Sequence, residues 1–320
     1  MMMRRNIIFA IAVLGVLSIS CKKDKNNTAT YKSMSGDLSV GTEMPSFVNP
    51  GDKFDFVSSG VTIPESETDK TVERVYTYKD SEKNKKDTID KYSVVIPDIV
   101  GEYKVTATAE AKGYYTKTKV LTTTVVSGKS LTSCDKSSLA QIQDSRDSKH
   151  YRATVIGGRT WMADNLAYYE KNAEGKYTLG NPYSGVKATE DVFGGFYSWG
   201  DARKACPSGW RIPTVDEWNA LGESAGDLMC DAYYNGGRLW EFWPEVKKTN
   251  KHSFFAMPFG YATIVDGEYT FTGFNDYAFY WADDAGKPVC KYIYVSNPKV
   301  IDWPSASETD FAAQLRCIKE

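Results

Sequence analysis

The chain has 320 residues, 13% of them aromatic and 25% charged, and its formal net charge is -2 at pH 7. This length is enough for two domains of ordinary size. The near-neutral charge gives no basic field for a phosphate backbone, so we exclude nucleic acid as a partner. With only two histidines, the chain also offers little imidazole for base or zinc chemistry.

The N-terminus has the pattern of an export signal. Arg4 and Arg5 precede an apolar run at residues 7–19 that ends at Ser20 and Cys21. A basic start followed by a short apolar run is typical of a secretory signal, which we place at residues 1–20. The run is shorter than the roughly 20 residues that a membrane-spanning helix needs. The position of Cys21 after a small residue resembles the lipidation site of Bacteroidota lipoproteins, and a signal cleaved without lipidation is the alternative.

The resemblance to lipoproteins implies a location. Residues 21–30 are polar and predict a flexible tether. Several acyl chains on Cys21 would hold the protein firmly at a bilayer surface without spanning it. Lys22 argues against retention in the inner membrane, so we expect a lipid-anchored protein of the outer membrane. Whether it faces the cell surface or the periplasm stays open.

Residues 31–127 predict a small all-β domain. Apolar and polar side chains alternate along residues 101–110, and this period of two is typical of a strand with one face on a core. Gly113 then turns the chain into a β-branched run at residues 114–126, which predicts the partner strand of a hairpin. Earlier strands are predicted at residues 53–57, 72–78 and 92–96. The side chains expected on the buried face are Tyr103, Val105, Ala107 and Ala109.

The same region resembles a known domain type. Residues 101–103, Gly-Glu-Tyr, are similar to the tyrosine corner of immunoglobulin-like and PKD-like domains. The resemblance implies an Ig-like β-sandwich that acts as a spacer or docks a partner; a sandwich of another topology is the alternative. Lysines at residues 79–91 alternate with acidic residues and predict a solvated hairpin loop. Serine-rich residues 128–143 are the predicted linker.

Residues 144–320 predict a second domain with mixed α and β structure. Gly157 and Gly158 supply the positive φ angles that a two-residue hairpin turn needs. Thr214 and Glu217 have the spacing of a capping box, which predicts the start of a helix. The residues expected in the core are Tyr151, Ile156, Trp161 and Met162, and Trp218 and Leu221 fall on one face of the predicted helix.

Three motifs in this second region carry a family resemblance. They are WMADNL at residues 161–166, ACPSGWRIPT at residues 205–214 and LRCI at residues 315–318. Together they resemble the Fibrobacter succinogenes major paralogous domain, a family similar to the C-type lectin and sulfatase-modifying-factor folds. The resemblance implies a lectin-like α+β domain over residues 144–320 that presents binding loops. The chain departs from the family pattern after Trp281, where acidic residues replace small hydroxyl residues.

The region around residues 275–284 is the candidate binding site. Carboxylate and amide oxygens are the ligands that calcium prefers, and aromatic rings stack on sugar rings. We expect a glycan or protein ligand here, with calcium as an option and not a requirement; ordinary turn formation is the alternative for the asparagine and the aspartates. The candidate residues are Asn275, Asp276, Tyr277, Tyr280, Trp281, Asp283 and Asp284.

Six cysteines are present, and the five besides Cys21 cannot all pair within one chain. Lectin-like folds tie the helical region to the last strand, so the resemblance implies a disulfide between Cys206 and Cys317. Cys230 and Cys290 form a weaker second pair, which would leave Cys134 free or in an intermolecular bond. Buried thiols that pack as small apolar groups are the alternative.

Catalysis is the minority interpretation. Sulfatase-modifying factors are copper-dependent oxidases that use two closely spaced cysteines near the C-terminus, whereas Cys290 and Cys317 here are 27 residues apart. The sequence contains no nucleophile elbow and no H-E-x-x-H helix. We therefore expect a binding or adhesion module that is not an enzyme and has no required cofactor. A structural or tip subunit of a surface assembly comes second, and an enzyme related to sulfatase-modifying factors comes third.

Overall fold

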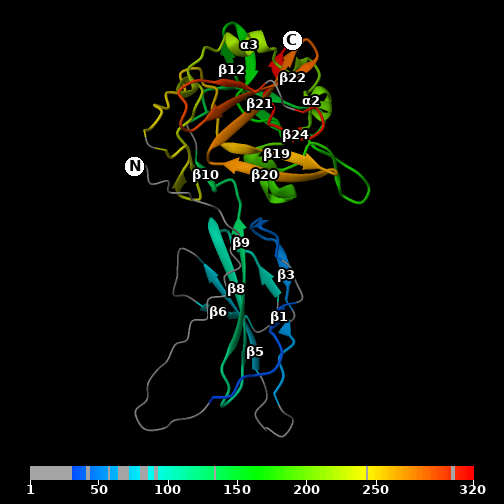
Figure 1. The fold of residues 1–320 in the computed structure, drawn as a ribbon, viewed down its shortest axis with the longest axis vertical. Helices are drawn as coiled ribbons and strands as arrows, with labels where there is room; N and C mark the ends of the chain where they lie inside the picture. The colour runs from blue at the N-terminus through cyan, green and yellow to red at the C-terminus, as the bar shows by residue number, and fades with distance from the viewer. Residues whose placement is uncertain are drawn as a thin grey trace.

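The computed structural model describes residues 31–40, 44–56, 58–63, 72–79, 86–89, 93–132, 135–242, 244–303 and 307–320. The predicted signal, tether and lipidation site at Cys21 lie outside these residues, and so does Cys134. Strands in several sheets predominate, and the helices are few and short. Two parts lie end to end, an N-terminal part with strands β1 to β9 and a C-terminal part with strands β10 to β25 (Figure 1).

The main sheet of the N-terminal part has the strand order β2-β9-β8-β5-β6. Its longest members, β8 (Gly101–Glu110) and β9 (Lys117–Val125), pair antiparallel, which confirms the predicted hairpin. The four side chains predicted to be buried on β8 are at most 3% exposed. Thr108, on the other face, is also buried. The remaining strands are β2 (Phe47–Val48), β5 (Val72–Lys79) and β6 (Lys86–Ile89).

A second, smaller layer covers the apolar face of this sheet. It contains the strand pairs β3 (Lys53–Asp55) with β7 (Ser93–Val95), and β1 (Ser39–Val40) with β4 (Ser58–Ser59). Val48, Phe56, Val94, Tyr103 and Val105 pack together, so side chains of both layers meet in one cluster. Three of the earlier predicted strands thus correspond to β3, β5 and β7.

One sheet of the C-terminal part brings the three family motifs together. Its order is β11-β12-β13-β25-β16. Trp161 of the first motif and Arg211 of the second both pair with Ile318 of the third. Gly157 and Gly158 have φ angles of 58° and 79° in the turn between β12 and β13, as predicted. The strands are β11 (Ala140–Gln143), β12 (His150–Ile156), β13 (Arg159–Met162), β16 (Trp210–Arg211) and β25 (Ile318–Lys319).

A second C-terminal sheet has the order β20-β19-β21-β22-β23, with β24 paired to β19. Strands β19 and β21 of this sheet pair parallel, at Gly260 and Ala278. The central strand β21 is covered on both faces by apolar clusters. The strands are β19 (Phe259–Val265), β20 (Glu268–Phe274), β21 (Tyr277–Asp284), β22 (Lys287–Tyr294), β23 (Ile301–Trp303) and β24 (Phe311–Ala312).

Two apolar clusters fill the C-terminal part. The Phe254 cluster includes Trp161, Trp218, Phe254, Phe259, Ala262 and Tyr280. The Trp281 cluster includes Tyr197, Trp199, Phe279, Trp281 and Phe311. The core residues predicted from the sequence are all buried in one or the other.

Short helices and small hairpins complete the C-terminal part. Helix α3 (Val215–Asn219) begins at the predicted capping box, in which Thr214 and Glu217 each accept a hydrogen bond from the other's backbone N–H. No helix among the described residues is both long and apolar enough to cross a membrane. The other elements are β10 (Leu131–Thr132), β14 (Glu170–Lys171), β15 (Tyr177–Leu179), η2 (Tyr183–Gly185), η3 (Lys187–Thr189), α1 (Glu190–Phe193), α2 (Trp199–Ala205), η4 (Ala225–Asp227), β17 (Tyr233–Tyr234) and β18 (Gly237–Arg238).

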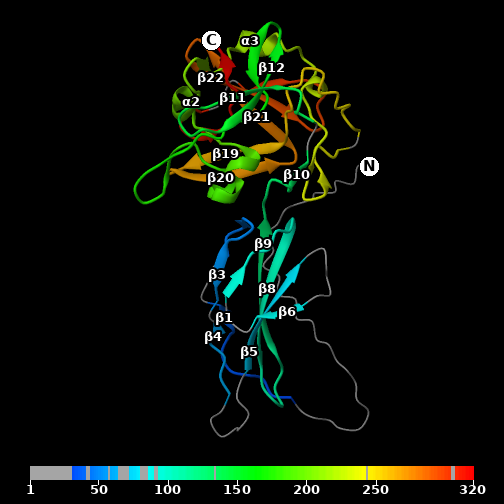
Figure 2. The same cartoon turned by 180° about the vertical axis from the view of Figure 1, so that it is seen from behind.

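The two parts meet where β9 leads into β10 (Figure 2). Strand β10 pairs with β17, and β11 pairs with β12, so much of the predicted linker at residues 128–143 belongs to C-terminal sheets. The linker is therefore shorter than predicted, because Leu131 and Ile142 pack against the C-terminal clusters. Phe47 of β2 also contacts Tyr183 edge-on, with ring centroids 6.2 Å apart.

A fully buried arginine joins two of the family motifs. Arg316 donates through Nε to Oδ1 of Asn165 at 2.6 Å, and through its terminal nitrogens to the carbonyl oxygens of Phe254 and Phe255. Its guanidinium carbon also lies 4.9 Å from the centre of the Phe254 ring. The charge is thus held by oxygen acceptors and a ring face inside the core.

Candidate functional site

Partly exposed aromatic side chains gather on one face of the second C-terminal sheet. We call this set the aromatic face: Tyr261, Tyr277, Tyr292, Tyr294 and Trp303. They come from strands β19, β21, β22 and β23. Strand register explains the gathering, because Tyr277 lies directly opposite Tyr294, and side chains opposite one another share a face. Trp303 is 37% exposed, the largest exposed fraction in the set.

The rings of the aromatic face are packed against one another. Tyr277 and Tyr294 stack with centroids 4.5 Å apart and planes 12° apart. Tyr292 stacks in the same way on buried Phe279, at 5.0 Å. Such pairs contribute about 0.5–1.5 kcal/mol each beyond the area they bury. Because these stacked rings cover each other's faces, a ligand would meet mainly their edges and hydroxyl groups.

The Tyr277 phenol of this face keeps its proton at neutral pH. Burial, reinforced by neighbouring Tyr294 and Asp276, raises the pKa of Tyr277 to about 12. Burial also raises the pKa of the Asp276 carboxyl. The Tyr277 hydroxyl can therefore both donate and accept a hydrogen bond at the edge of the aromatic face.

Comparison with known families identifies the C-terminal part. A family model described as the Fibrobacter succinogenes major domain matches residues 155–319. The chain belongs to this family. The matched range contains the aromatic face and the paired motif strands β13, β16 and β25. No curated protein matches the chain closely enough to count as a relative.

The structure of the major domain separates the predicted calcium ligands. Asn275 and Asp276 precede β21, whereas Asp283 and Asp284 end it. Since a strand rises about 3.3 Å per residue, the two pairs are roughly 23 Å apart. The four oxygen-bearing residues therefore do not surround one ion, and the calcium option, if it applies, would involve only one of the two pairs. Among the described residues, no three His, Cys, Asp or Glu side chains are grouped as metal ligands.

Two of these residues instead form turns. Asn275 has a φ of 72°, and its Oδ1 accepts a hydrogen bond from the Trp240 backbone N–H at 3.0 Å. Asp283 accepts one from the Gly286 N–H through Oδ1, within the turn between β21 and β22. The turn-forming alternative considered for these residues is thus the one that the structure supports for Asn275 and Asp283.

Two of the three predicted aromatic ligands lie in the core of the major domain. Tyr280 and Trp281 are fully buried, so the prediction that they stack on a sugar ring is wrong. Trp281 donates through Nε1 to the carbonyl oxygen of Tyr197 at 2.7 Å, and Tyr280 packs against Trp218. Both sit in the middle of a strand that is covered on both faces. Tyr277 lies at the strand's beginning, and it alone of the three belongs to the aromatic face.

The other four members of the aromatic face were not among the predicted residues. Tyr292 and Tyr294 are two positions apart, which is the spacing of side chains on one face of a strand. That signal was present in the sequence. The approach of Tyr261 and Trp303 depends on the order of the strands, which the sequence does not reveal.

The cysteines of the major domain confirm one predicted pair and contradict the other. Cys206 and Cys317 form a disulfide with a Cα–Cα distance of 5.9 Å. Cys290 is a free, buried thiol, so the pair with Cys230 is wrong. The reason is that Cys230 belongs to the Phe254 cluster and Cys290 to the Trp281 cluster. Burial raises the pKa of the Cys290 thiol well above its ordinary value, which disfavours the reactive thiolate.

Proposed function

We propose that this protein is a non-catalytic binding module that recognises a glycan or another surface component through its aromatic face. The observation that carries the proposal is the aromatic face itself. It places four tyrosines and one tryptophan, all at least partly exposed, on one rigid sheet. Tyrosine and tryptophan supply large contact area at low cost in side-chain entropy, and their polar tips supply hydrogen bonds.

Packing within the face supports a preformed site. The Tyr277–Tyr294 stack fixes both side chains before any ligand arrives, and buried Phe279 supports Tyr292 from below. Less ordering on binding leaves more of the contact energy as affinity. Ring edges and hydroxyl groups suit a ligand that carries both C–H and O–H groups, as a saccharide does.

The proposal extends to the whole chain. We infer a lipid on Cys21, an outer-membrane location with the face left open, an Ig-like spacer at residues 31–127 and a lectin-like fold at residues 144–320. The layered N-terminal strands and the long β8–β9 hairpin support the Ig-like assignment. The lectin-like assignment is supported by the disulfide that ties the end of α2 to the last strand.

An open sheet edge supports a second candidate, a subunit of a surface assembly. Strand β2 pairs with β9 only at Thr124 and Val125. Among the described strands, none pairs with residues 117–122 of β9 on that side, and Val120 is 50% exposed. A strand of another protein adds readily to such an edge.

The test is binding of the mature chain, made soluble by Cys21→Ser, to a broad glycan array with and without EDTA. We expect hits that Trp303→Ala and Tyr294→Ala both weaken. Tyr233→Ala is the matched control, because Tyr233 is 43% exposed but lies outside the aromatic face. EDTA should have no effect, since the predicted calcium ligands are split between the two ends of β21.

Two outcomes would contradict this proposal. Hits that survive both aromatic-face substitutions would move the site elsewhere on the protein. A blank array would favour the assembly candidate, and cross-linking in the native membrane would then be expected to trap a partner at β9.

A further inference from the structure

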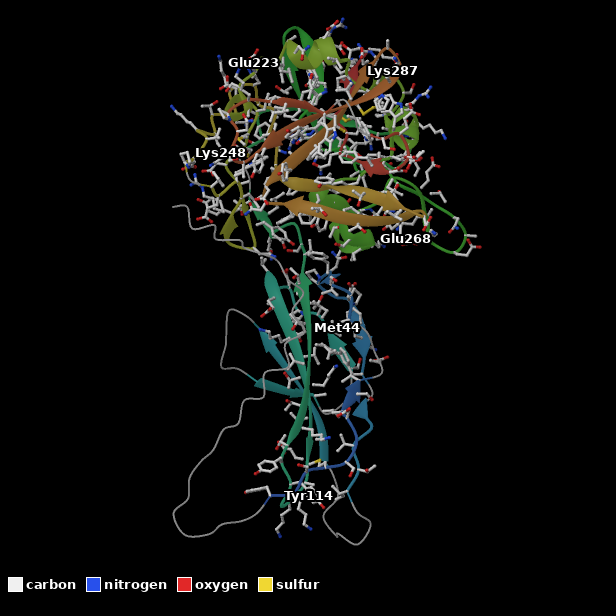
Figure 3. All side chains as sticks on the ribbon, in the orientation of Figure 1. Met44, Tyr114, Glu223, Lys248, Glu268 and Lys287 are labelled. Carbon is white, nitrogen blue, oxygen red and sulfur yellow. A yellow bond between two sulfur atoms is a disulfide. The ribbon has the colours of Figure 1, made fainter. Side chains whose placement is uncertain are left out.

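A groove lies between the β14–β15 hairpin and the tip of the β19–β20 hairpin. We call it the hairpin groove; its volume is about 370 Å³. Figure 3 shows Glu268 at the tip of the β19–β20 hairpin, beside the green loop that carries β14 and β15. Phe271 lines the groove and packs on the Phe254 cluster, whereas Tyr261 of the aromatic face packs on the Trp281 cluster. The groove and the aromatic face therefore use opposite faces of one sheet.

The groove gathers polar side chains that the protein itself does not use. Within the described part of the chain, the side chains of five lining residues make no hydrogen bond or ion pair: Thr178, Asn181, Ser184, Asp201 and Glu268. Neighbouring Glu190 is different, because it accepts hydrogen bonds from Lys171 and from the Tyr177 hydroxyl. Donors and acceptors that the protein itself does not pair therefore line the groove.

Aromatic rings form part of its walls. Tyr269 and Phe271 lie side by side, with centroids 6.2 Å apart and planes 26° apart. Burial, followed by the nearby Asp201 carboxylate, raises the pKa of Tyr269 to about 12, so its hydroxyl keeps its proton. Rings, hydroxyls, an amide and carboxylates in one concavity can hold both the C–H face and the O–H groups of a sugar.

Two glycines hold the backbone of the groove in conformations that other residues rarely adopt. Gly180 has a φ of 67°, and a Cβ there would lie 2.7 Å from the Tyr197 ring. Gly267 has a φ of 80° and follows Asp266, whose φ of 52° completes the two-residue turn between β19 and β20. Both positions require glycine, so the groove is preformed by the backbone.

We propose that the hairpin groove is a second ligand site that takes one saccharide unit without an acid group. Its volume falls in the range of roughly 300–1,000 Å³ that small-molecule sites occupy. The lining carries Asp201 and Glu268 against a single cation, Lys176, so its net charge repels uronates and other acidic sugars. The inference rests on the proposed glycan-binding function, but it depends on different residues.

The test follows the glycine amides of the groove by NMR of the soluble mature chain. Methyl β-D-glucopyranoside and D-glucosamine are expected to shift the amide signals of Gly175, Gly180 and Gly267, and D-glucuronate is not. Asp201→Asn and Glu268→Gln should each raise the Kd at least about tenfold, because each removes a charged hydrogen-bond acceptor. Asp266→Asn is the matched control, since this carboxylate lies in the same turn but does not line the groove.

Spermidine is included to separate sugar recognition from simple attraction of cations. Glycine shifts with spermidine but with neither sugar would overturn the proposal, as would no shift with any probe or equal binding of glucuronate and glucoside. Trp303→Ala should leave the groove shifts unchanged. Array hits that depend on Trp303, without any groove shifts, would leave the proposed function standing and remove this inference. Groove shifts with the sugars, without array hits that depend on Trp303, would keep the groove as a ligand site and remove the aromatic face as one.

Discussion

Strands β8 and β21 both carry aromatic and apolar residues, yet only in β8 does the sequence pattern show which side chains are buried. Strand β8 alternates, and its inward side chains are buried whereas its outward ones, apart from Thr108, are at least partly exposed, because one face of its sheet is turned away from the core. In β21, Ala278 to Ala282 are all buried, since apolar clusters cover both faces. Alternation therefore reports burial only where one side of a sheet is open.

The prediction with the largest expected effect removes a fully buried charge from the C-terminal part. Arg316→Met leaves the oxygens of Asn165, Phe254 and Phe255 without a donor, so we expect the free energy of unfolding to fall by about 3–5 kcal/mol. Urea unfolding followed by tryptophan fluorescence measures it cleanly, because all eight tryptophans lie between residues 161 and 303.

Exposed Arg203 in α2 supplies the control, and Arg203→Met should change stability by less than about 0.5 kcal/mol. If Arg316→Met had an equally small effect, the buried hydrogen bonds would not be what holds the two motifs together.

The disulfide is expected to have the next largest effect. Cys206 and Cys317 are 111 residues apart, so the bond greatly restricts the unfolded chain. Replacing both by serine should lower the free energy of unfolding by about 2–5 kcal/mol. Fluorescence-detected unfolding with and without a reductant measures this, and the reductant should destabilise the wild type but not the variant. Equal sensitivity of both proteins would show that another bond responds to the reductant.

Local features of the fold were predictable, and distant contacts were not. The turn at Gly157 and the capping box at Thr214 depend on residues at most three positions away, so the sequence contains all the information needed. The pairing of Asn165 with Arg316 spans 151 residues, and the burial of Trp281 depends on the carbonyl of Tyr197. Neither could be foreseen from spacing. The disulfide was predicted only because the family resemblance supplied the distant contact.

The candidate site shows the same limit. An aromatic residue in a run such as residues 277–281 can be core or surface, and only the neighbouring strands decide which. Of the three rings proposed from the sequence, only Tyr277 lies on the aromatic face, and the face as a whole required the register of β21 on β22 and the approach of Trp303 from β23.

Matched valines test whether alternation in the N-terminal part reports burial. Val105→Ala on β8 removes methyl groups from a closed core and should cost about 2 kcal/mol. Val120→Ala on β9 changes a half-exposed side chain and should cost less than about 0.5 kcal/mol. Far-UV circular dichroism during urea unfolding follows both variants. Equal losses would mean that the outer face of this sheet is covered in solution.

The smallest effect concerns the capping box at α3 and its dependence on pH. Glu217 accepts two hydrogen bonds from Arg211, at 2.7 and 2.8 Å, and a third from the Thr214 N–H. The bonds from Arg211 contribute most to lowering the pKa of Glu217 to about 2, from an ordinary value of 4.5. The folded state therefore favours the ionised carboxylate, and its stabilising effect is complete above about pH 4.5 and is lost as the pH falls toward 2.

Glu217→Gln should lower the free energy of unfolding by about 1 kcal/mol at pH 7, because the amide can still cap the helix but carries no charge for Arg211. The variant should also lose less stability than the wild type between pH 5 and pH 2.5, which thermal unfolding at both values measures. Glu174→Gln, on the exposed turn of the β14–β15 hairpin, is the control. Parallel pH profiles for wild type and Glu217→Gln would assign the acid sensitivity to other carboxylates. The charge of Glu217 would then add nothing to stability beyond its role in capping the helix.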